Sequence, residues 1–226
     1  MDNRYIGVFD SGLGGLTAVK ELKKELPGEN IVYFGDTGRV PYGTRSEETL
    51  IKYTVGDINF LKTHDIKAIV VACGTVSSVV MPHLIEKEAL PMIGVVEPTS
   101  RKAARLTKTK KIGIIGTNAT IKSQKYEQTL KQIDSEIKTI SVACPMFVPL
   151  AENGMADSEA AYLITREYLA VFEKEPVDTL ILGCTHYPLL SSTIRRVIGD
   201  DVTLVDSGVA TAEYIREFLT DRKSVV

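Results

Sequence analysis

Two cysteines occupy similar settings in this chain, and their type and spacing suit proton transfer. Cys73 follows the apolar run Ala68–Ala72, and Cys184 follows the apolar run Leu180–Leu182 and one glycine. Such runs are typical of buried parallel strands, and a helical pattern follows each one. Ligands bind beyond the carboxyl ends of such strands. A nearby helix N-terminus favours a thiolate, so we expect a lowered pKa at both cysteines. One such residue could be an ordinary buried thiol, but two at matching strand ends favour a function.

Two thiols that face one small ligand from opposite sides could invert a carbon stereocentre. One thiolate would remove a proton from the carbon, and the opposite thiol would return a proton to the other face. Carbon acids beside a carboxylate are very weak, so hydrogen-bond donors in a dry cleft must stabilise the developing carbanion. The sequence contains neither a pyridoxal-lysine motif nor a metal motif. Chemistry without a cofactor is therefore the simpler hypothesis.

Three ionisable residues could help the thiols to hold or pass a proton. Asp10 ends the first predicted strand, beside the expected place of Cys73, and His186 lies two residues after Cys184. Imidazole exchanges a proton near neutral pH. Glu152 is an acid in an otherwise apolar loop, although exposed loop acids are common. Cys184 and His186 lack a second ligand pair at finger-like spacing, which argues against a zinc site.

Polar residues after other predicted strands could bind a ligand. Ser11 follows the first strand, and the loop 36–43 after the second strand has glycines and a proline that permit close backbone approach. Thr117 and Thr120 open a helix, where hydroxyl and free N–H groups suit a carboxylate. Helix capping or an ordinary surface loop would also explain each of them.

The glycines of residues 12–15 suggest a dinucleotide site, but the pattern is incomplete. Thr17 occupies the third glycine position of the motif, and Asp10 would oppose a bound pyrophosphate. Nicotinamide binding is therefore the less favoured alternative.

The segments that must position these residues alternate between strand and helix. This alternation predicts an α/β fold of parallel sheets flanked by helices. One helix should run from Leu16 to Leu26, and another should begin after the N-cap Ser46. Pro188 should open a helix after Cys184. The predicted strands are Ile6–Phe9, Ile31–Phe34, Ala68–Ala72, Ile93–Val96, Ile112–Ile115, Ile137–Val142, Leu180–Leu182 and Val202–Val205.

The first four strands and the last four repeat at a nearly constant offset. Ile6 and Ile112 are 106 residues apart, and Cys73 and Cys184 are 111 residues apart. Regular α/β proteins often show some period, but the matched cysteines favour two similar halves related by a pseudo-twofold axis. The site would then lie in the cleft between them. We expect a first domain of 1–97 plus 208–226 and a second domain of 98–207.

Composition excludes several classes of function. The 226 residues carry a net charge of −2, with ordinary charged and apolar content. No basic block indicates nucleic acid, no apolar run approaches membrane-spanning length, and the first residues lack a signal-peptide core. Three cysteines fit poorly with a disulfide scaffold, so we expect the reducing cytoplasm. Cys144 has no repeat partner, which favours a structural role.

Together these residues resemble the cofactor-independent glutamate racemases of bacterial cell-wall synthesis, within the aspartate/glutamate racemase family. The resemblance extends through nearly the whole chain. The motifs that carry it are Gly7-Val8-Phe9-Asp10-Ser11-Gly12-Leu13-Gly14-Gly15, Gly35-Asp36-Thr37, Pro41-Tyr42-Gly43, Ala72-Cys73-Gly74-Thr75, Cys144-Pro145, Pro149-Leu150-Ala151-Glu152 and Gly183-Cys184-Thr185-His186-Tyr187-Pro188.

The resemblance implies that Cys73 acts on the D-enantiomer and Cys184 on the L-enantiomer, with help from Asp10, Glu152 and His186. It also implies a homodimer that supplies D-glutamate for peptidoglycan. Related aspartate racemases usually have an acid in place of His186, so glutamate is the favoured substrate. The implied substrate contacts are Asp10, Ser11, Pro41, Tyr42, Gly43, Gly74, Thr75, Thr117, Thr120, Thr185 and His186.

Two features depart from the family pattern. Gly74 stands where members commonly have Asn, which removes a side-chain donor that a backbone N–H could replace. The family also usually continues for some tens of residues beyond the helix after Asp206, so a short form or a fragment is expected. The alternatives are an aspartate or other amino-acid racemase, a dithiol redox switch, and an inactive amino-acid-binding relative.

Overall fold

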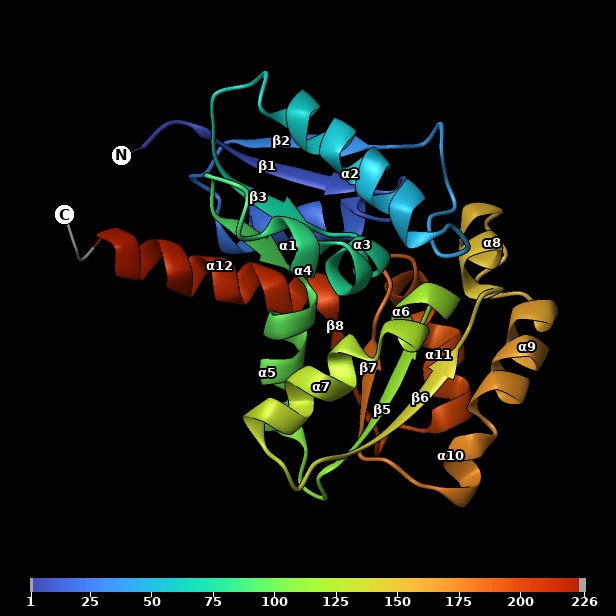
Figure 1. Ribbon diagram of the computed structural model, residues 1–226. Coiled ribbons are helices and arrows are strands. Elements are labelled where there is room, and N and C mark those ends of the chain that lie inside the picture. Colours follow the sequence, from blue (N-terminus) through green and yellow to red (C-terminus); the bar gives the residue numbers. More distant parts are fainter. Residues whose placement is uncertain (1, 224–226) are drawn as a thin grey trace.

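The computed structural model describes residues 2–223 and contains two four-stranded parallel sheets. The strand orders are β2-β1-β3-β4 and β6-β5-β7-β8, so the two halves share one topology, as the repeat predicted. The first sheet lies in the upper half of Figure 1 and the second sheet in the lower half. The strands are β1 (Tyr5–Asp10), β2 (Ile31–Gly35), β3 (Ile66–Val71), β4 (Met92–Gly94), β5 (Lys111–Gly116), β6 (Lys138–Ala143), β7 (Thr179–Leu182) and β8 (Thr203–Asp206).

One predicted strand ends too late. The fourth apolar run was expected to stay extended to Val96, but β4 ends at Gly94 and helix α5 (Val96–Leu106) begins two residues later. Val95 already has helical dihedral angles, with φ −78° and ψ −20°. Glu97 and Pro98 then suit a first helical turn, where an acid is favourable and a missing N–H costs little.

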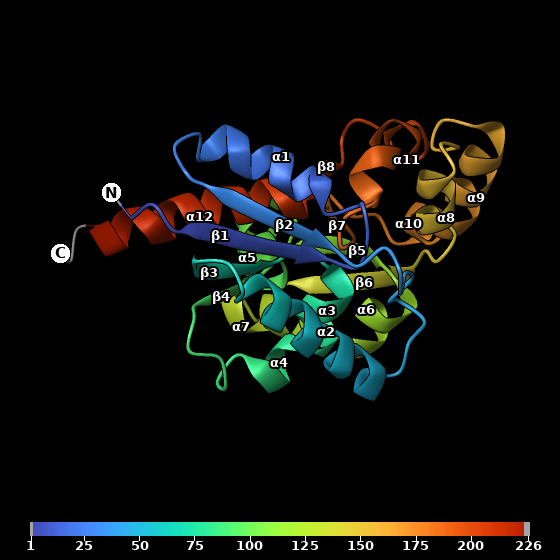
Figure 2. The ribbon, with the colours of Figure 1, turned by 90° about the horizontal axis from the view of Figure 1, so that it is seen from above.

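Helices cover both faces of the first sheet, and alternate strand residues explain why (Figure 2). Ile6 and Val8 of β1 face a cluster that contains residues of α1 (Leu16–Glu25), whereas Phe9 faces the opposite cluster with α2 (Glu47–Leu61). Successive strand side chains point to opposite faces, so each face needs its own cover. Two short helices, α3 (Gly74–Val79) and α4 (Met81–Leu84), connect β3 to β4.

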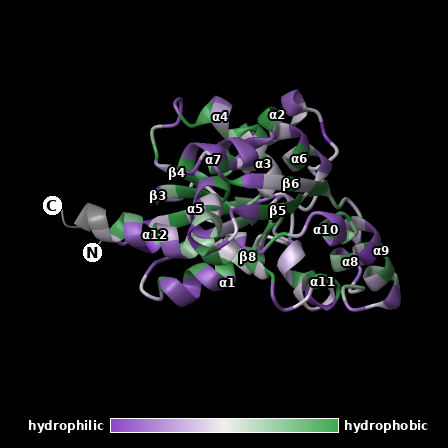
Figure 3. Cartoon of the chain, turned by 90° about the horizontal axis from the view of Figure 1, so that it is seen from below, coloured by the Kyte–Doolittle hydropathy of each residue, from purple (hydrophilic) through white to green (hydrophobic). Residues whose placement is uncertain are grey.

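The second sheet is covered in the same way. One cluster joins Ile112 and Ile114 to α5 and α7, and the other joins Ile115 and Leu182 to α8, α9 and α11. Figure 3 shows apolar residues gathered on the strands and on the inner sides of the helices. The remaining elements are α6 (Asn118–Ser123), α7 (Lys125–Ile133), α8 (Phe147–Glu152), α9 (Glu159–Leu169), α10 (Val171–Lys174), the 3₁₀ turn η1 (Tyr187–Leu190) and α11 (Ser191–Ile198).

The helix boundaries predicted from capping residues and prolines can be compared with those of the structure. The Ser46 side chain caps α2 by accepting a hydrogen bond from Thr49 N–H at 3.3 Å. Helix α1 spans Leu16–Glu25 and ends two residues before Pro27. Pro188 lies in η1, so a tight 3₁₀ turn precedes α11 rather than one continuous α-helix.

Helix α12 (Ser207–Lys223) connects the last strand back to the first half (Figure 1). Its buried Ala212 and Ile215 belong to the same cluster as Ile6 and Val8 of β1. The division into domains of 1–97 plus 208–226 and 98–207 stays a prediction, and residues 1 and 224–226 lie outside the described residues. No helix within residues 2–223 combines the length and the apolar character that a membrane span requires.

The two halves meet through backbone beside the cysteines. A Cβ atom built on Gly74, at the start of α3, would lie 2.2 Å from the Gly183 carbonyl oxygen. No side-chain rotation could relieve that overlap, because both partners are backbone.

Gly74→Ala should therefore destabilise the fold, although alanine by itself favours a helix by up to about 1 kcal/mol. The clash requires the two segments to separate, and overpacking of this kind costs roughly 1–3 kcal/mol. Urea unfolding of the variant measures the loss. Gly28→Ala is the matched control, since a Cβ there would meet nothing within 4 Å. Equal stability of the two variants would contradict the tight contact.

Candidate active site

A cavity of about 420 Å³ lies at the carboxyl ends of both sheets, and both cysteines line it. Cys73 caps the start of α3 directly after β3, and Cys184 lies between β7 and η1. The two strand ends identified from sequence thus contribute to a single cavity. Its lining residues are Ser11, Val40, Pro41, Tyr42, Gly43, Thr44, Cys73, Gly74, Thr75, Thr117, Asn118, Pro145, Val148, Pro149, Glu152, Asn153, Cys184, Thr185 and His186.

Two of the predicted site residues do not line the cavity. Asp10 is fully buried behind it, and the Thr120 hydroxyl lies 3.0 Å from the Thr117 hydroxyl, behind that lining residue. The candidates selected from sequence also omitted several lining residues, namely Val40, Thr44, Asn118, Pro145, Val148, Pro149 and Asn153. For all of these except Pro145, which lies seven residues before Glu152, the available signal was a candidate residue within four positions in the sequence.

Burial dominates the chemistry of Cys73. It raises the pKa of the Cys73 thiol to about 12, and the nearby Asp10 carboxylate adds to the rise. Hydrogen bonding from Val76 N–H and from Ser11 acts in the opposite direction but is weaker. At neutral pH this group is therefore a thiol that can donate a proton, and it needs a base before it can accept one.

Asp10 is an acid held by backbone N–H groups. Its Oδ2 accepts hydrogen bonds from Gly15 N–H at 2.8 Å and from Gly12 N–H at 3.3 Å. Complete burial raises the pKa of the Asp10 carboxyl, while the nearby His186 and these N–H groups favour the charged form. A carboxyl with opposing influences of this size is suited to hold a proton and release it.

Cys184 belongs to a chain of three ionisable side chains. His186 Nδ1 lies 3.8 Å from the Cys184 sulfur, and His186 Nε2 lies 2.5 Å from Glu152 Oε1. A neutral imidazole that donates its Nε2–H to a carboxylate leaves Nδ1 as an acceptor. This arrangement allows the Cys184 proton to pass to His186, whose positive charge Glu152 would stabilise.

The expected lowering of the two thiol pKa values is wrong for this structure. Burial raises the pKa of Cys184 as well as that of Cys73, and ionisation of Cys73 would raise it further. Desolvation disfavours the charged form, and here it outweighs the local N–H donors. Backbone hydrogen bonding near His186 only partly offsets the rise at Cys184.

Polar contacts join the two halves around the cavity. The Thr75 and Thr117 hydroxyls lie 2.9 Å apart, and the Thr185 hydroxyl donates to Asp10 Oδ1 at 3.4 Å. Each pair takes one residue from each half. These hydroxyls therefore bridge the two halves. Each has a single hydrogen, so one that donates to a bound ligand must release the bridge in which it is the donor.

Cys144 does not line the cavity, in agreement with the structural role predicted for it. Its side chain is fully buried, and its carbonyl oxygen accepts a hydrogen bond from the Tyr187 hydroxyl at 2.8 Å. Within residues 2–223, no group of three or more His, Cys, Asp or Glu side chains is placed to hold a metal ion.

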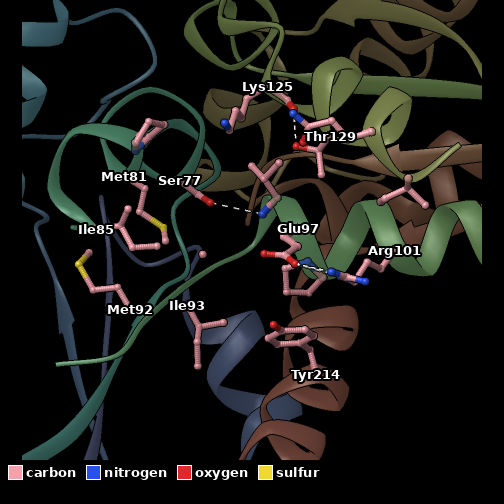
Figure 4. Close-up of a pocket in the computed structure, with 16 residues that line it drawn as sticks. Ser77, Met81, Ile85, Met92, Ile93, Glu97, Arg101, Lys125, Thr129 and Tyr214 are labelled. Carbon is pink, nitrogen blue, oxygen red and sulfur yellow. Dashed lines mark hydrogen bonds and ion pairs between the residues drawn. The ribbon is translucent and has the colours of Figure 1, made fainter. Parts of the chain in front are cut away.

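A larger cavity, of about 600 Å³, lies elsewhere, among α4, β4, α5, α7 and α12 (Figure 4). None of the three cysteines lines it. Its Arg101 side chain is paired with Glu97 at 2.8 Å, and Ser77 accepts a hydrogen bond from Val96 N–H. The cavity with the two thiols is therefore the candidate active site, although it is the smaller of the two.

Comparisons with known proteins agree with this geometry. The family model described as Asp/Glu/Hydantoin racemase matches residues 15–215. The glutamate racemase of Geobacter metallireducens is 49% identical over 216 residues, which cover 96% of this chain and 80% of that protein.

Solved structures give the same result. Glutamate racemase RacE1 of Bacillus anthracis matches with a TM-score of 0.95 and 42% identity, over 98% of this chain and 84% of that one. The Francisella tularensis glutamate racemase, solved in complex with D-glutamate, matches with a TM-score of 0.91 and 38% identity, over 99% and 83%.

The raised thiol pKa values predict an unusual pH dependence of alkylation. Because the thiolate is the nucleophile, the rate of reaction of Cys73 with iodoacetamide should still rise about tenfold per pH unit between pH 8 and pH 10. In the urea-unfolded chain the rate should level off above about pH 9. Peptide mass spectrometry measures both rates. A plateau near pH 9 in the folded protein would contradict the raised pKa.

Proposed function

This chain belongs to the Asp/Glu/Hydantoin racemase family, and we propose that Cys73 and Cys184 are the two bases of its reaction. That reaction is the interconversion of L- and D-glutamate, by relation to glutamate racemases up to 49% identical over most of the chain. The observation that carries the assignment of bases is their placement in one cavity, each from a different half and each near an ionisable group, Asp10 for Cys73 and His186 for Cys184.

The reaction in the L-to-D direction begins at Cys184. His186 accepts the thiol proton, and the resulting thiolate removes the α-proton of L-glutamate. The Cys73 thiol then donates its proton to the opposite face of the carbanion, which gives D-glutamate and a Cys73 thiolate. Asp10, which begins protonated, returns a proton to Cys73. His186 releases the proton that it had gained to solvent, and a proton from solvent restores Asp10. The reverse direction begins at Cys73, with Asp10 as the acceptor.

The polar groups of the cavity wall can stabilise the carbanion by hydrogen bonding to the substrate. The hydroxyls of Ser11, Thr75, Thr117 and Thr185 surround the space between the cysteines and can donate to the substrate carboxylates. Because these four residues are buried, hydrogen bonds to them are stronger than they would be at the surface. The role as substrate contacts extends to Pro41, Tyr42, Gly43 and Gly74, which line the same cavity.

The same proposal covers the setting of the enzyme. D-Glutamate from this reaction enters peptidoglycan synthesis in the cytoplasm, and the three free cysteines suit that reducing compartment. We further propose a homodimer, by resemblance to the family, and sedimentation of the purified chain tests it.

The first test is exchange of the α-proton. L-Glutamate incubated with the pure protein in deuterated water, without added cofactor, should lose its α-proton NMR signal while D-glutamate accumulates. Absence of exchange with glutamate, together with binding measured by calorimetry, would favour an inactive amino-acid-binding relative. Turnover of L-aspartate but not of glutamate would favour an aspartate racemase.

The second test removes one thiol at a time. Cys73→Ser and Cys184→Ser should each lower racemisation at least about 100-fold, because a missing acid or base typically costs that much. Cys144→Ser is the matched control and should retain activity. Activity that survives either of the first two changes would favour a dithiol redox role and refute the two-base mechanism.

The third test concerns the direction of the reaction. His186→Asn should slow the reaction from L-glutamate more than the reaction from D-glutamate, because His186 contacts Cys184. Initial rates of deuterium incorporation from each enantiomer measure the two effects separately. Equal slowing of both exchange rates would mean that His186 does not act through Cys184.

A further inference from the structure

A charged network that neither thiol uses lies at the base of the loop 36–46. Arg39 Nε lies 2.5 Å from Asp36 Oδ2, and Arg39 Nη2 lies 2.8 Å from Asp57 Oδ1. The Tyr42 hydroxyl hydrogen-bonds to Asp36 and lies 3.0 Å from Asp57 Oδ2. Asp36 and Asp57 are only 6% and 1% exposed. The sequence indicated Asp36 as part of a polar loop and of the motif Gly35-Asp36-Thr37, and it did not indicate Asp57.

Two buried carboxylates this close together require a cation. Burial raises the pKa of Asp57 to about 6; the Asp36 charge adds to the rise, while hydrogen bonds from Tyr42 and Arg39 reduce it. The Tyr42 hydroxyl has one hydrogen and can donate to one of the two carboxylates at a time. The Arg39 guanidinium can bond both at once, because its N–H donors form a rigid fork.

The network attaches the loop to helix α2. Asp36 follows β2 directly, whereas Asp57 belongs to α2, so Arg39 links the two elements. The guanidinium also lies 4.5 Å from the centre of the Tyr53 ring of α2, and the Tyr42 ring is 5.6 Å from that ring. Both carboxylates and the Tyr53 ring thus contact one arginine, and the Tyr42 ring packs beside Tyr53.

The other side of the same loop faces the cavity. Its segment 40–44 lines the cavity that holds the two cysteines. The Gly43 carbonyl oxygen accepts a hydrogen bond from Ala119 N–H at 3.3 Å, and a Cβ atom on Gly43 would lie 2.7 Å from Thr117 Cβ. The loop therefore spans from α2 to the second half along the cavity wall.

We propose that Arg39 is a positioning residue for this reaction and that, with Asp36 and Asp57, it holds segment 40–44 in the conformation that binds the substrate. The inference rests on the proposed function of the cavity. Arg39 touches no thiol, so its loss weakens the binding of both enantiomers alike. In a variant without Arg39, the conformational entropy of the loop would be lost at each substrate-binding event instead of on folding.

Arg39→Ala tests the proposal through the separation of KM from kcat. KM should rise about fivefold or more for both enantiomers, while kcat stays within about twofold of the wild type. Hydrogen–deuterium exchange should become faster at the amides of residues 36–46. Arg4→Ala is the matched control. It removes an ion pair between Arg4 and Asp2, 2.8 Å long, which precedes β1 at the amino-terminal ends of the strands, away from the cavity. Its KM and exchange should not change.

Asp57→Asn tests whether the geometry or the charge holds the loop. The amide oxygen can accept from Arg39, and the amide NH2 group can donate to the Tyr42 hydroxyl oxygen while that hydroxyl donates to Asp36, so KM should stay near the wild-type value. Should Arg39→Ala not fold, Arg39→Lys carries the test, since an ammonium group reaches one carboxylate and should give a smaller rise in KM.

The outcomes separate the two proposals. A wild-type protein that does not exchange the α-proton of glutamate would overturn the proposed function. Unchanged exchange of residues 36–46 in the Arg39 variant would overturn the role of Arg39. A KM within twofold of the wild type, or a rise for one enantiomer only, would overturn that role as well.

Discussion

Burial of ionisable groups between two sheets is the constraint on which the site depends. Cys73, Cys184, Asp10 and His186 are all less than 8% exposed, and little water can reach them. Burial keeps both thiols protonated at neutral pH, which suits them to donate a proton. The same burial means that neither thiol can become a base without an adjacent acceptor. Each half of the molecule therefore has to supply its own proton acceptor as well as its own cysteine.

The two halves share one topology, but they place different ionisable residues beside their cysteines. The strand orders are equivalent, so each half offers one cysteine at the carboxyl end of its third strand in sequence order. The partner of Cys73 is a buried carboxyl held by backbone N–H groups, whereas the partner of Cys184 is an imidazole backed by Glu152. A repeated fold thus presents two different ionisable partners, and in the proposed mechanism this asymmetry would distinguish the two directions of the reaction.

Close backbone contact and a fixed loop complete the cavity. Gly74 approaches the Gly183 carbonyl so closely that any side chain at this position would force the two segments apart. The absence of a side chain at Gly74 thus permits a close backbone junction beside both thiols. Along the cavity wall, the charges around Arg39 hold a loop whose Tyr42 ring also packs in the apolar cluster of the first sheet.

Sequence alone determined the elements and the chemistry that they carry. Apolar runs and turn residues act locally, so they identified all eight strands, the Ser46 cap and two cysteines at matching strand ends. Only the tertiary structure decided how those groups behave. It placed Asp10 and Thr120 behind the cavity, brought Asp57 to Arg39, and raised both thiol pKa values where helix ends alone predicted lower ones. The physical reason is that desolvation depends on every neighbour in space, and residues far apart in sequence supply most of those neighbours.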